Sequence, residues 1–261
     1  SGLIYGYVND GFYKVEDFEY FDSKSRTWKL KEGVVDSSPL SDTPRPGNAT
    51  FKKLTPVDPN SSNPYQLTEA DRTVIGNTTP KFSGGFGLNA TYKGFDLSMF
   101  FNFMYDFDVF NANKVMLTTW ADNHENNFGM EVASDKRWRN FDDMGNEIRY
   151  SPELLAEFNK NATMWNPTSI GKPISMSYAV EDGSFLRLNS ATLGYTLPQE
   201  WTKKAGLNKV RFYVAGSNLF TITGYSGYDP EVDIATGLTP NIDNNRYPRS
   251  RTYTFGAQLT F

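Results

Sequence analysis

The chain has 261 residues and a formal net charge of −4, and the absence of cysteine excludes disulfides, thiolate zinc sites and cysteine nucleophiles. No cluster of Lys or Arg is interleaved with aromatic residues, so the sequence offers no electrostatic basis for binding nucleic acid. Aromatic residues make up 15% of the chain, with 20 Phe and 15 Tyr, which favours an all-β fold.

Residues 1–81 are expected to form a long loop region or a small surface subdomain. Beyond the short run LIYGYV from Leu3, convincing strands are few, and turn-forming residues recur in TPRPGNAT from Thr43 and TPVDPNSSNP from Thr55.

Residues 82–261 carry five segments that alternate apolar and polar side chains, as strands do. The first two, 82–92 and 95–105, are joined at Lys93-Gly94 and predict a β-hairpin. The third, from Ser184 to Pro198, changes phase in its middle, which predicts a β-bulge near Asn189-Ser190. The last two are expected at residues 210–216 and 253–261.

The connections between these strands are very unequal in length. Short links are expected at residues 93–94 and 198–207, and long ones at 106–183 and 221–249. Strands that alternate up and down place both long links on one side, which is typical of an outer-membrane barrel with extended extracellular loops. A short helix is predicted after Ser151-Pro152-Glu153, where a capping Ser precedes a Pro.

Each strand of about ten residues could cross a membrane when tilted, and aromatic residues stand at several strand ends, as interfacial girdles do. The polar faces are then expected to line the lumen, at Ser83, Asn89, Asp96, Asn102, Thr254 and Gln258. A soluble, secreted β-rich binding module or adhesin is the alternative, with the same aromatic side chains in a dry core between two sheets. Five strands cannot close a membrane barrel, so the chain is expected to be part of a longer one.

Five stretches resemble the C-terminal part of SusC/RagA-type TonB-dependent transporters: DRTVIGNTTPKFSGGF from Asp71, YKGFDLSMFF from Tyr92, GSFLRLNSATLGYTLP from Gly183, VAGSNLFTITGYSGYDPE from Val214 and YPRSRTYTFGAQLTF from Tyr247. The resemblance implies a 22-stranded barrel in the bacterial outer membrane, with the plug and the TonB-contacting segment upstream of Ser1. It further implies a SusD-like surface lipoprotein as a lid, TonB as the energising partner, and an oligosaccharide or a peptide as substrate.

The candidate substrate-binding residues are Tyr225, Tyr228 and Asp229, since aromatic faces beside a carboxylate can hold a sugar or peptide.

In the family, the stretch before DRTVIGN commonly resembles an EF-hand loop. Here Asp58, Asn60, Glu69 and Asp71 could supply oxygen ligands to calcium, but Pro59 and Pro64 interrupt the run and no Gly supplies the sharp turn. Whether this loop binds calcium is left open by the sequence.

No catalytic site, metal site or cofactor is expected. The single histidine, His124, has no second His and no Cys near it. The carboxylate pairs Asp142-Asp143 and Glu181-Asp182 stand beside Gly, which is typical of turns. A surface hydrolase built from these four carboxylates remains a rival hypothesis that no spacing favours.

Overall fold

The computed structural model describes residues 2–41, 43–119, 129, 132, 136–170, 174–232 and 241–261. Contacts between residues divide the chain into two compact units. Unit 1 contains Leu3–Gly76 and Phe110–Val180, and unit 2 contains Asn77–Val109 and Glu181–Phe261. The extracellular position expected for residues 1–81, 106–183 and 221–249 stays a prediction.

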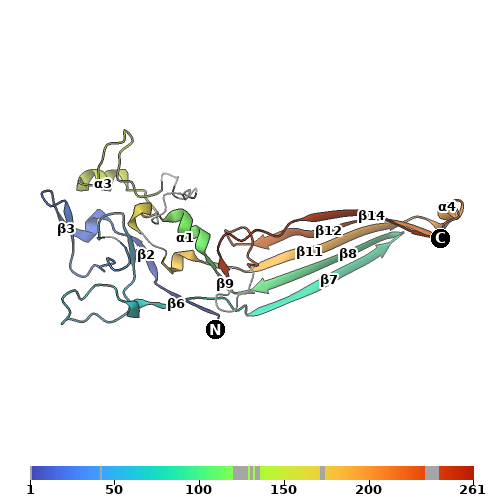
Figure 1. Cartoon of the computed structure of the whole chain (residues 1–261), viewed down its shortest axis with the longest axis horizontal. Coiled ribbons are helices and arrows are strands. Elements are labelled where there is room, and N and C mark those ends of the chain that lie inside the picture. The colour runs from blue at the N-terminus through green and yellow to red at the C-terminus, as the bar shows by residue number, and fades with distance from the viewer. Residues whose placement is uncertain are drawn as a thin grey trace. The chain divides into compact units, whose positions relative to one another are not determined.

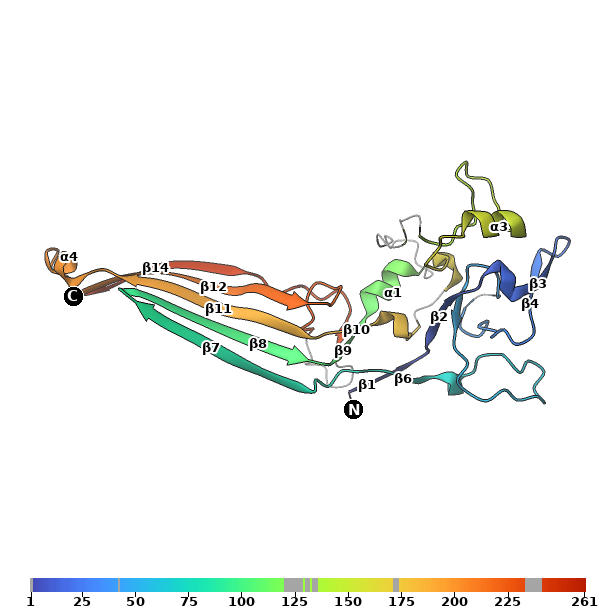
Figure 2. The same ribbon diagram turned by 180° about the vertical axis from the view of Figure 1, so that it is seen from behind.

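Unit 2 is built on a five-stranded antiparallel sheet with the order β14-β12-β11-β8-β7 (Figures 1 and 2). The strands are β7 (Phe82–Tyr92), β8 (Phe95–Tyr105), β11 (Phe185–Thr196), β12 (Lys209–Thr223) and β14 (Thr252–Thr260). All five predicted strands are therefore confirmed. Strand β12 continues to Thr223, further than the expected end at residue 216.

A two-residue turn joins β7 to β8, as the sequence predicts. Lys93 has φ 46° and Gly94 has φ 87°, and this pair of positive φ angles gives a turn whose twist matches that of the strands. Phe82 consequently pairs with Tyr105 and Tyr92 with Phe95, so the hairpin is in register over its whole length.

The predicted bulge is confirmed, and it extends across neighbouring strands. Between the positions paired with Leu188 and Ser190, β8 has no extra residue, since Phe101 and Phe100 are consecutive. Strand β11 has one, Asn189, and β12 has two, Asn218 and Leu219. Asn218 adopts φ 53°, a left-handed conformation that Asn tolerates better than most residues.

The bulge keeps all the apolar side chains of β11 except Phe185 on one side of the sheet. Leu186 and Leu188 precede it, and Ala191, Leu193 and Tyr195 follow it in the opposite phase. We call this side the apolar face; its large exposed members are Phe82, Phe86, Leu88, Tyr92, Phe95, Tyr105, Leu193, Phe212, Val214, Phe220, Ile222, Tyr253, Phe255 and Leu259. The opposite side, the polar face, carries Ser83, Asn89, Asp96, Asn102, Arg187, Arg211, Thr254 and Gln258.

Besides the five long strands, the chain has a small three-stranded sheet and a short helix between β11 and β12. A three-stranded sheet has the order β10-β9-β13, formed by β9 (Asp108–Asn111), β10 (Val180–Asp182) and β13 (Ile242–Asp243). Helix α4 (Gln199–Lys203) lies in the link between β11 and β12. In unit 2, the side chains of Phe107, Val109, Phe185, Tyr225 and Val232 form a buried cluster.

Unit 1 consists of short paired strands, short helices and their connections. Its two-stranded sheets pair β1 (Leu3–Gly6) with β6 (Thr73–Asn77), β2 (Asn9–Phe12) with β5 (Ala49–Phe51), and β3 (Phe18–Asp22) with β4 (Thr27–Leu30). The helices are α1 (Ala112–Thr118), α3 (Pro152–Phe158) and the 3₁₀ turns η1 (Val15–Asp17), η2 (Glu69–Asp71), η3 (Pro167–Ser169) and η4 (Ser177–Ala179).

Helix α3 is the helix predicted after Ser151. The Ser151 hydroxyl accepts a hydrogen bond from the Leu154 amide, and Pro152 occupies the first helical position. Among the described residues, no helix has both the length and the apolar character needed to cross a membrane.

Candidate functional site

The predicted substrate-binding residues lie in one loop, residues 224–232, which follows β12 in unit 2. The structure gives the three side chains different environments. Tyr225 is buried at 6% exposure, Tyr228 is 82% exposed, and Asp229 pairs with an arginine of the sheet. Only Tyr228 is therefore open to a ligand without a rearrangement.

Tyr225 anchors the loop through apolar packing and one hydrogen bond. Its ring packs against Phe107, Phe185 and Val232, and its hydroxyl donates a 2.7 Å hydrogen bond to Oδ2 of Asp243. Burial raises the pKa of the Tyr225 hydroxyl, and the Asp243 carboxylate that accepts its proton raises it further. Tyr225 therefore stays neutral and donates this hydrogen bond at any physiological pH.

Asp229 anchors the loop through an ion pair. Its Oδ1 lies 2.5 Å from Nη2 of Arg187, which projects from β11 on the polar face and is 2% exposed. Glu231 lies 3.7 Å from the same Nη2 and accepts a 2.7 Å bond from Arg249. A buried guanidinium needs such partners, since an unpaired buried charge is strongly destabilising.

A third contact fixes the start of the loop. The Ser226 amide and hydroxyl donate to the two carboxylate oxygens of Glu181, at 2.9 and 2.8 Å. Tyr225, Ser226 and Asp229 thus anchor the loop, and the exposed ring of Tyr228 lies between anchored residues. We call Tyr228 with these anchors the Tyr228 loop.

Sequence reasoning found the loop but missed the residues that position it. Arg187, Glu231 and Asp243 have no motif of their own, and Arg187 stands in a strand where alternation predicts only a polar side chain. The signal that could have found Arg187 is a lone guanidinium on a strand face, because such a group requires a carboxylate partner when covered. Whether Tyr225, Tyr228 and Asp229 contact substrate stays a prediction.

The polar face carries a second ion pair further along the sheet. Arg211 on β12 donates from Nε to Oδ1 of Asp96 on β8 at 2.9 Å, and from Nη2 to Oδ2 at 2.5 Å. The two strands are separated by β11, and the guanidinium crosses it over Gly194. Two aromatic side chains of this face also lie over glycines of neighbouring strands, Tyr213 over Gly256 and Phe100 over Gly85.

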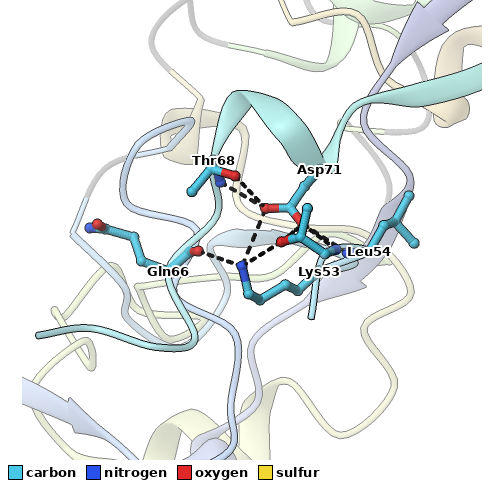
Figure 3. Close-up of polar contacts among 6 residues, drawn as sticks. Lys53, Leu54, Gln66, Thr68 and Asp71 are labelled. Atoms are coloured by element: carbon cyan, nitrogen blue, oxygen red, sulfur yellow. Dashed lines mark hydrogen bonds and ion pairs between the residues drawn. The ribbon is translucent and has the colours of Figure 1, made fainter. Parts of the chain in front are cut away.

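In unit 1, Asp71 is fully buried and collects hydrogen bonds from two segments (Figure 3). Its Oδ1 accepts from the amides of Leu54 and Thr55 and from the Thr55 hydroxyl at 2.7–2.9 Å. Its Oδ2 accepts from the amide and hydroxyl of Thr68 at 2.8 and 3.1 Å, and Nζ of Lys53 lies 3.5 Å away.

Burial by itself would raise the pKa of Asp71, but the hydrogen bonds from Thr55, Thr68 and Leu54 outweigh it and hold the pKa well below its usual range. Asp71 is therefore a structural anion in this unit. The Lys53 ammonium stands beside its carboxylate, where a calcium ion would be repelled.

The other oxygen donors considered for calcium do not gather around Asp71. Oδ1 of Asp58 accepts from the Asn60 amide at 2.9 Å in an exposed turn. In the described ranges, no three His, Cys, Asp or Glu residues are grouped as a metal site would require. His124 lies outside the described residues.

The four carboxylates of the hydrolase hypothesis all have local partners. Asp142 accepts from the side chain and amide of Asn146, and these bonds lower its pKa. Asp143 pairs with Arg139 at 2.6 Å, Glu181 binds Ser226, and Asp182 accepts from Ser184. The described geometry therefore gives each of them a role in local structure.

Comparison with known proteins finds relatives across the whole chain, although no family model matches it. The chain is 32% identical over 266 residues to TonB-dependent receptor P3 of Formosa agariphila, with 100% of this chain and 22% of that protein aligned. It is 37% identical over 86 residues to TonB-dependent receptor SusC of Bacteroides thetaiotaomicron, which covers 32% of this chain and 8% of SusC.

Solved structures with the same fold come from the RagAB peptide transporter. One structure of it matches 99% of this chain and 23% of its own with a TM-score of 0.66 at 22% identity. Its closed-closed state matches 98% of this chain and 23% of its own with a TM-score of 0.62 at 23% identity. The chain spans about a fifth of the length of the curated relative that it matches throughout. By sequence and by fold, these residues belong to the SusC/RagA-type TonB-dependent receptors and form strands of their transmembrane barrel.

Proposed function

We propose that this chain forms part of the wall and outer loops of a nutrient importer in the bacterial outer membrane. The importer takes up an oligosaccharide or a peptide, draws energy from TonB, and works with a SusD-like surface lipoprotein. The chain contributes no catalysis, and its role is to line the transport route and to contact cargo near the entrance.

The observation that carries this proposal is the apolar face of the five-stranded sheet. Fourteen large apolar side chains stand exposed along it, and none of the described elements of unit 2 covers them. A soluble protein rarely leaves such a continuous surface open, whereas lipid matches it. A soluble binding module would need a second sheet against this face.

The polar face supports a lumenal role for the opposite side. Asp96 and Arg211 form their ion pair there, and a charge facing lipid near the bilayer midplane would cost about 2–4 kcal/mol. The Tyr228 loop is anchored to the same face through Arg187, so it stands on the side of the sheet that the cargo would pass.

The proposal is tested on the full-length protein in its native bacterium. An antibody to residues 247–261 is used to blot outer-membrane and soluble fractions, each with and without boiling. We expect a band confined to the outer membrane that changes mobility on boiling, as folded barrels do. A band in the soluble fraction would instead favour the secreted binding module or adhesin.

A second test separates import from mere location in the membrane. Deleting the gene, or deleting the gene of its SusD-like partner lipoprotein, should abolish growth on one complex nutrient while growth on its monomers continues. Unchanged growth on every oligosaccharide and peptide mixture tested, with the protein present in the outer membrane, would overturn the import function.

A further inference from the structure

Residues 137–143 of unit 1 border a cavity that the Tyr228 loop does not share. Its volume is about 460 Å³, within the range of roughly 300–1,000 Å³ found for small-molecule sites. Among the residues that line it are three arginines, two aromatic residues and an amide: Arg137, Arg139, Arg149, Trp138, Phe141 and Asn166.

The three arginines differ in how far they are already neutralised. Nη1 of Arg139 lies 2.6 Å from Asp143, and Nε of Arg149 lies 2.9 Å from Glu147. The guanidinium of Arg137 has no hydrogen bond or ion pair to any of the residues that the structure describes. Asp142, the other carboxylate of the lining, is occupied by the amides of its own turn. Asp142 keeps its negative charge and balances that of Arg137, so the distinctive feature of the wall is not its net charge but the guanidinium of Arg137, whose donors are free among the described residues.

A buried donor beside this charge also lacks a partner. Trp138 is 4% exposed, and its indole N–H has no hydrogen-bond acceptor within the described ranges. Nearly all buried polar groups in proteins are paired, so this N–H calls for an acceptor from a water or a ligand.

Gly47 sets the position of two walls of the cavity. It adopts φ +88°, and a Cβ at this position would lie 2.2 Å from the indole of Trp138, so the ring packs directly on the Gly47 backbone. The Gly47 carbonyl accepts a 2.7 Å hydrogen bond from the Asn166 amide. The backbone of Gly47 thus helps to position two of the residues that line the cavity, Trp138 and Asn166.

We propose that this cavity binds a carboxylate or sulfate group of a ligand, with Arg137 as its main contact. A guanidinium presents a planar fork of donors that matches the oxygens of either group. The half-exposed ring of Phe141 offers an apolar surface for the part of the ligand that carries the anion. The inference rests on the proposed function only in taking this ligand to be cargo.

Two sources could supply such a group: an acidic sugar, or an acidic peptide. The full-length protein, purified in detergent, is titrated by calorimetry with a galacturonate tetramer, a sulfated disaccharide and tetraglutamate. Maltotetraose serves as the neutral probe. We expect at least one anionic probe to bind and the neutral probe to bind at least tenfold more weakly, about the contribution of one charge-assisted hydrogen bond.

The variants test the role assigned to Arg137. Arg137→Ala should weaken the binding of the anionic probe by about tenfold or more, and Arg137→Lys should weaken it less, because charge remains and the fork is lost. Arg72→Ala is the matched control: Arg72 is an exposed arginine of the same unit outside the cavity lining, and its loss should leave affinity unchanged. Gly47→Ala should weaken binding by displacing Trp138.

Equal affinity of wild type and Arg137→Ala for the bound anion would overturn the site, as would the absence of binding by all three anionic probes. Either result leaves the importer proposal intact if the protein remains in the outer membrane. Conversely, anion binding that depends on Arg137 in a protein found only in the soluble fraction would support the site and overturn the importer.

Discussion

Arg211 and Asp96 pair across an intervening strand, because Gly194 of β11 leaves room for the guanidinium to pass. Nε of Arg211 donates to Asp96 at 2.9 Å, and a Cβ on Gly194 would lie 2.6 Å from Cζ of Arg211. The ion pair therefore links three strands of the polar face and depends on the absence of a side chain at residue 194.

We predict that Gly194→Ala disrupts this pair. The new methyl group displaces the guanidinium, so the ion pair is lost and the apparent melting temperature should fall. Alanine is by itself more favourable than glycine in a strand by about 0.5–1 kcal/mol. The same substitution should therefore be neutral or stabilising in an Arg211→Ala background. The apparent melting temperature of the folded band on gels compares the four proteins, and equal effects in both backgrounds would refute the coupling.

A second prediction concerns the two faces of β7. Leu88 lies on the apolar face and Asn89 on the polar face, near the middle of the strand. Leu88→Arg should destabilise the barrel by about 2–4 kcal/mol, whereas Asn89→Arg should have little effect. Since this stretch contains no cysteine, spin labels on Phe86→Cys and Asn89→Cys can report the surroundings directly. A label at 86 in water and one at 89 in lipid would reverse the assignment of faces.

A third prediction concerns Asp71. Asp71→Asn should destabilise the segment around η2 by about 3 kcal/mol or more, because it leaves the buried Lys53 ammonium without a counter-charge. Hydrogen exchange of the Leu54 and Thr55 amides, which donate directly to Asp71, measures the effect in the full-length protein. Asp58→Asn, in the exposed turn of the same loop, is the control and should leave both amides protected.

The lowered pKa of Asp71 also determines how the stability of this segment depends on pH. A carboxyl whose pKa is lowered on folding contributes its full stabilisation above its unfolded pKa of about 3.9, and loses it as the pH falls toward the folded value. Protection of the Leu54 and Thr55 amides should thus be constant from neutral pH to about pH 5 and fall below about pH 4. Loss of protection at pH 6 would show that another group controls this segment.

A fourth prediction separates the two tyrosines of the Tyr228 loop. Tyr228→Ala should reduce cargo affinity or uptake without changing stability, because its ring is 82% exposed. Tyr225→Phe should instead cost about 1–3 kcal/mol, since Asp243 loses a buried donor. Uptake assays and thermal melts on both variants distinguish the roles. Unchanged uptake with Tyr228→Ala would remove this residue from the proposed substrate contacts.

Strands β7 and β8 could be predicted from the sequence because their period of two is uninterrupted. Phe82 to Tyr105 contains a single turn at Lys93-Gly94, and both strand ends match. The true end of β12 could not be predicted, since Asn218 and Leu219 are extra residues that break the alternation before Phe220 and Ile222 resume it.

Unit 1 was harder to predict because its pairings join distant segments. Strand β1 pairs with β6 and β2 with β5, and none of these exceeds five residues. No local periodicity indicates such partners. The anchoring of Asp71 and the gathering of Arg137, Arg139 and Arg149 around one cavity depend on the same long-range contacts, so spacing along the sequence gives no sign of them.

The bulge at Asn189 shifts the alternation of side chains along β11 by one residue. Odd-numbered residues lie on the polar face before Asn189 and on the apolar face after it. Removing this one residue would turn Leu186 and Leu188 onto the polar face and Arg187 onto the apolar face, while every residue after it kept its place. An insertion or deletion at this position therefore keeps the side chains of β11 on their faces only when it involves an even number of residues. The turns at the strand ends are not subject to this restriction.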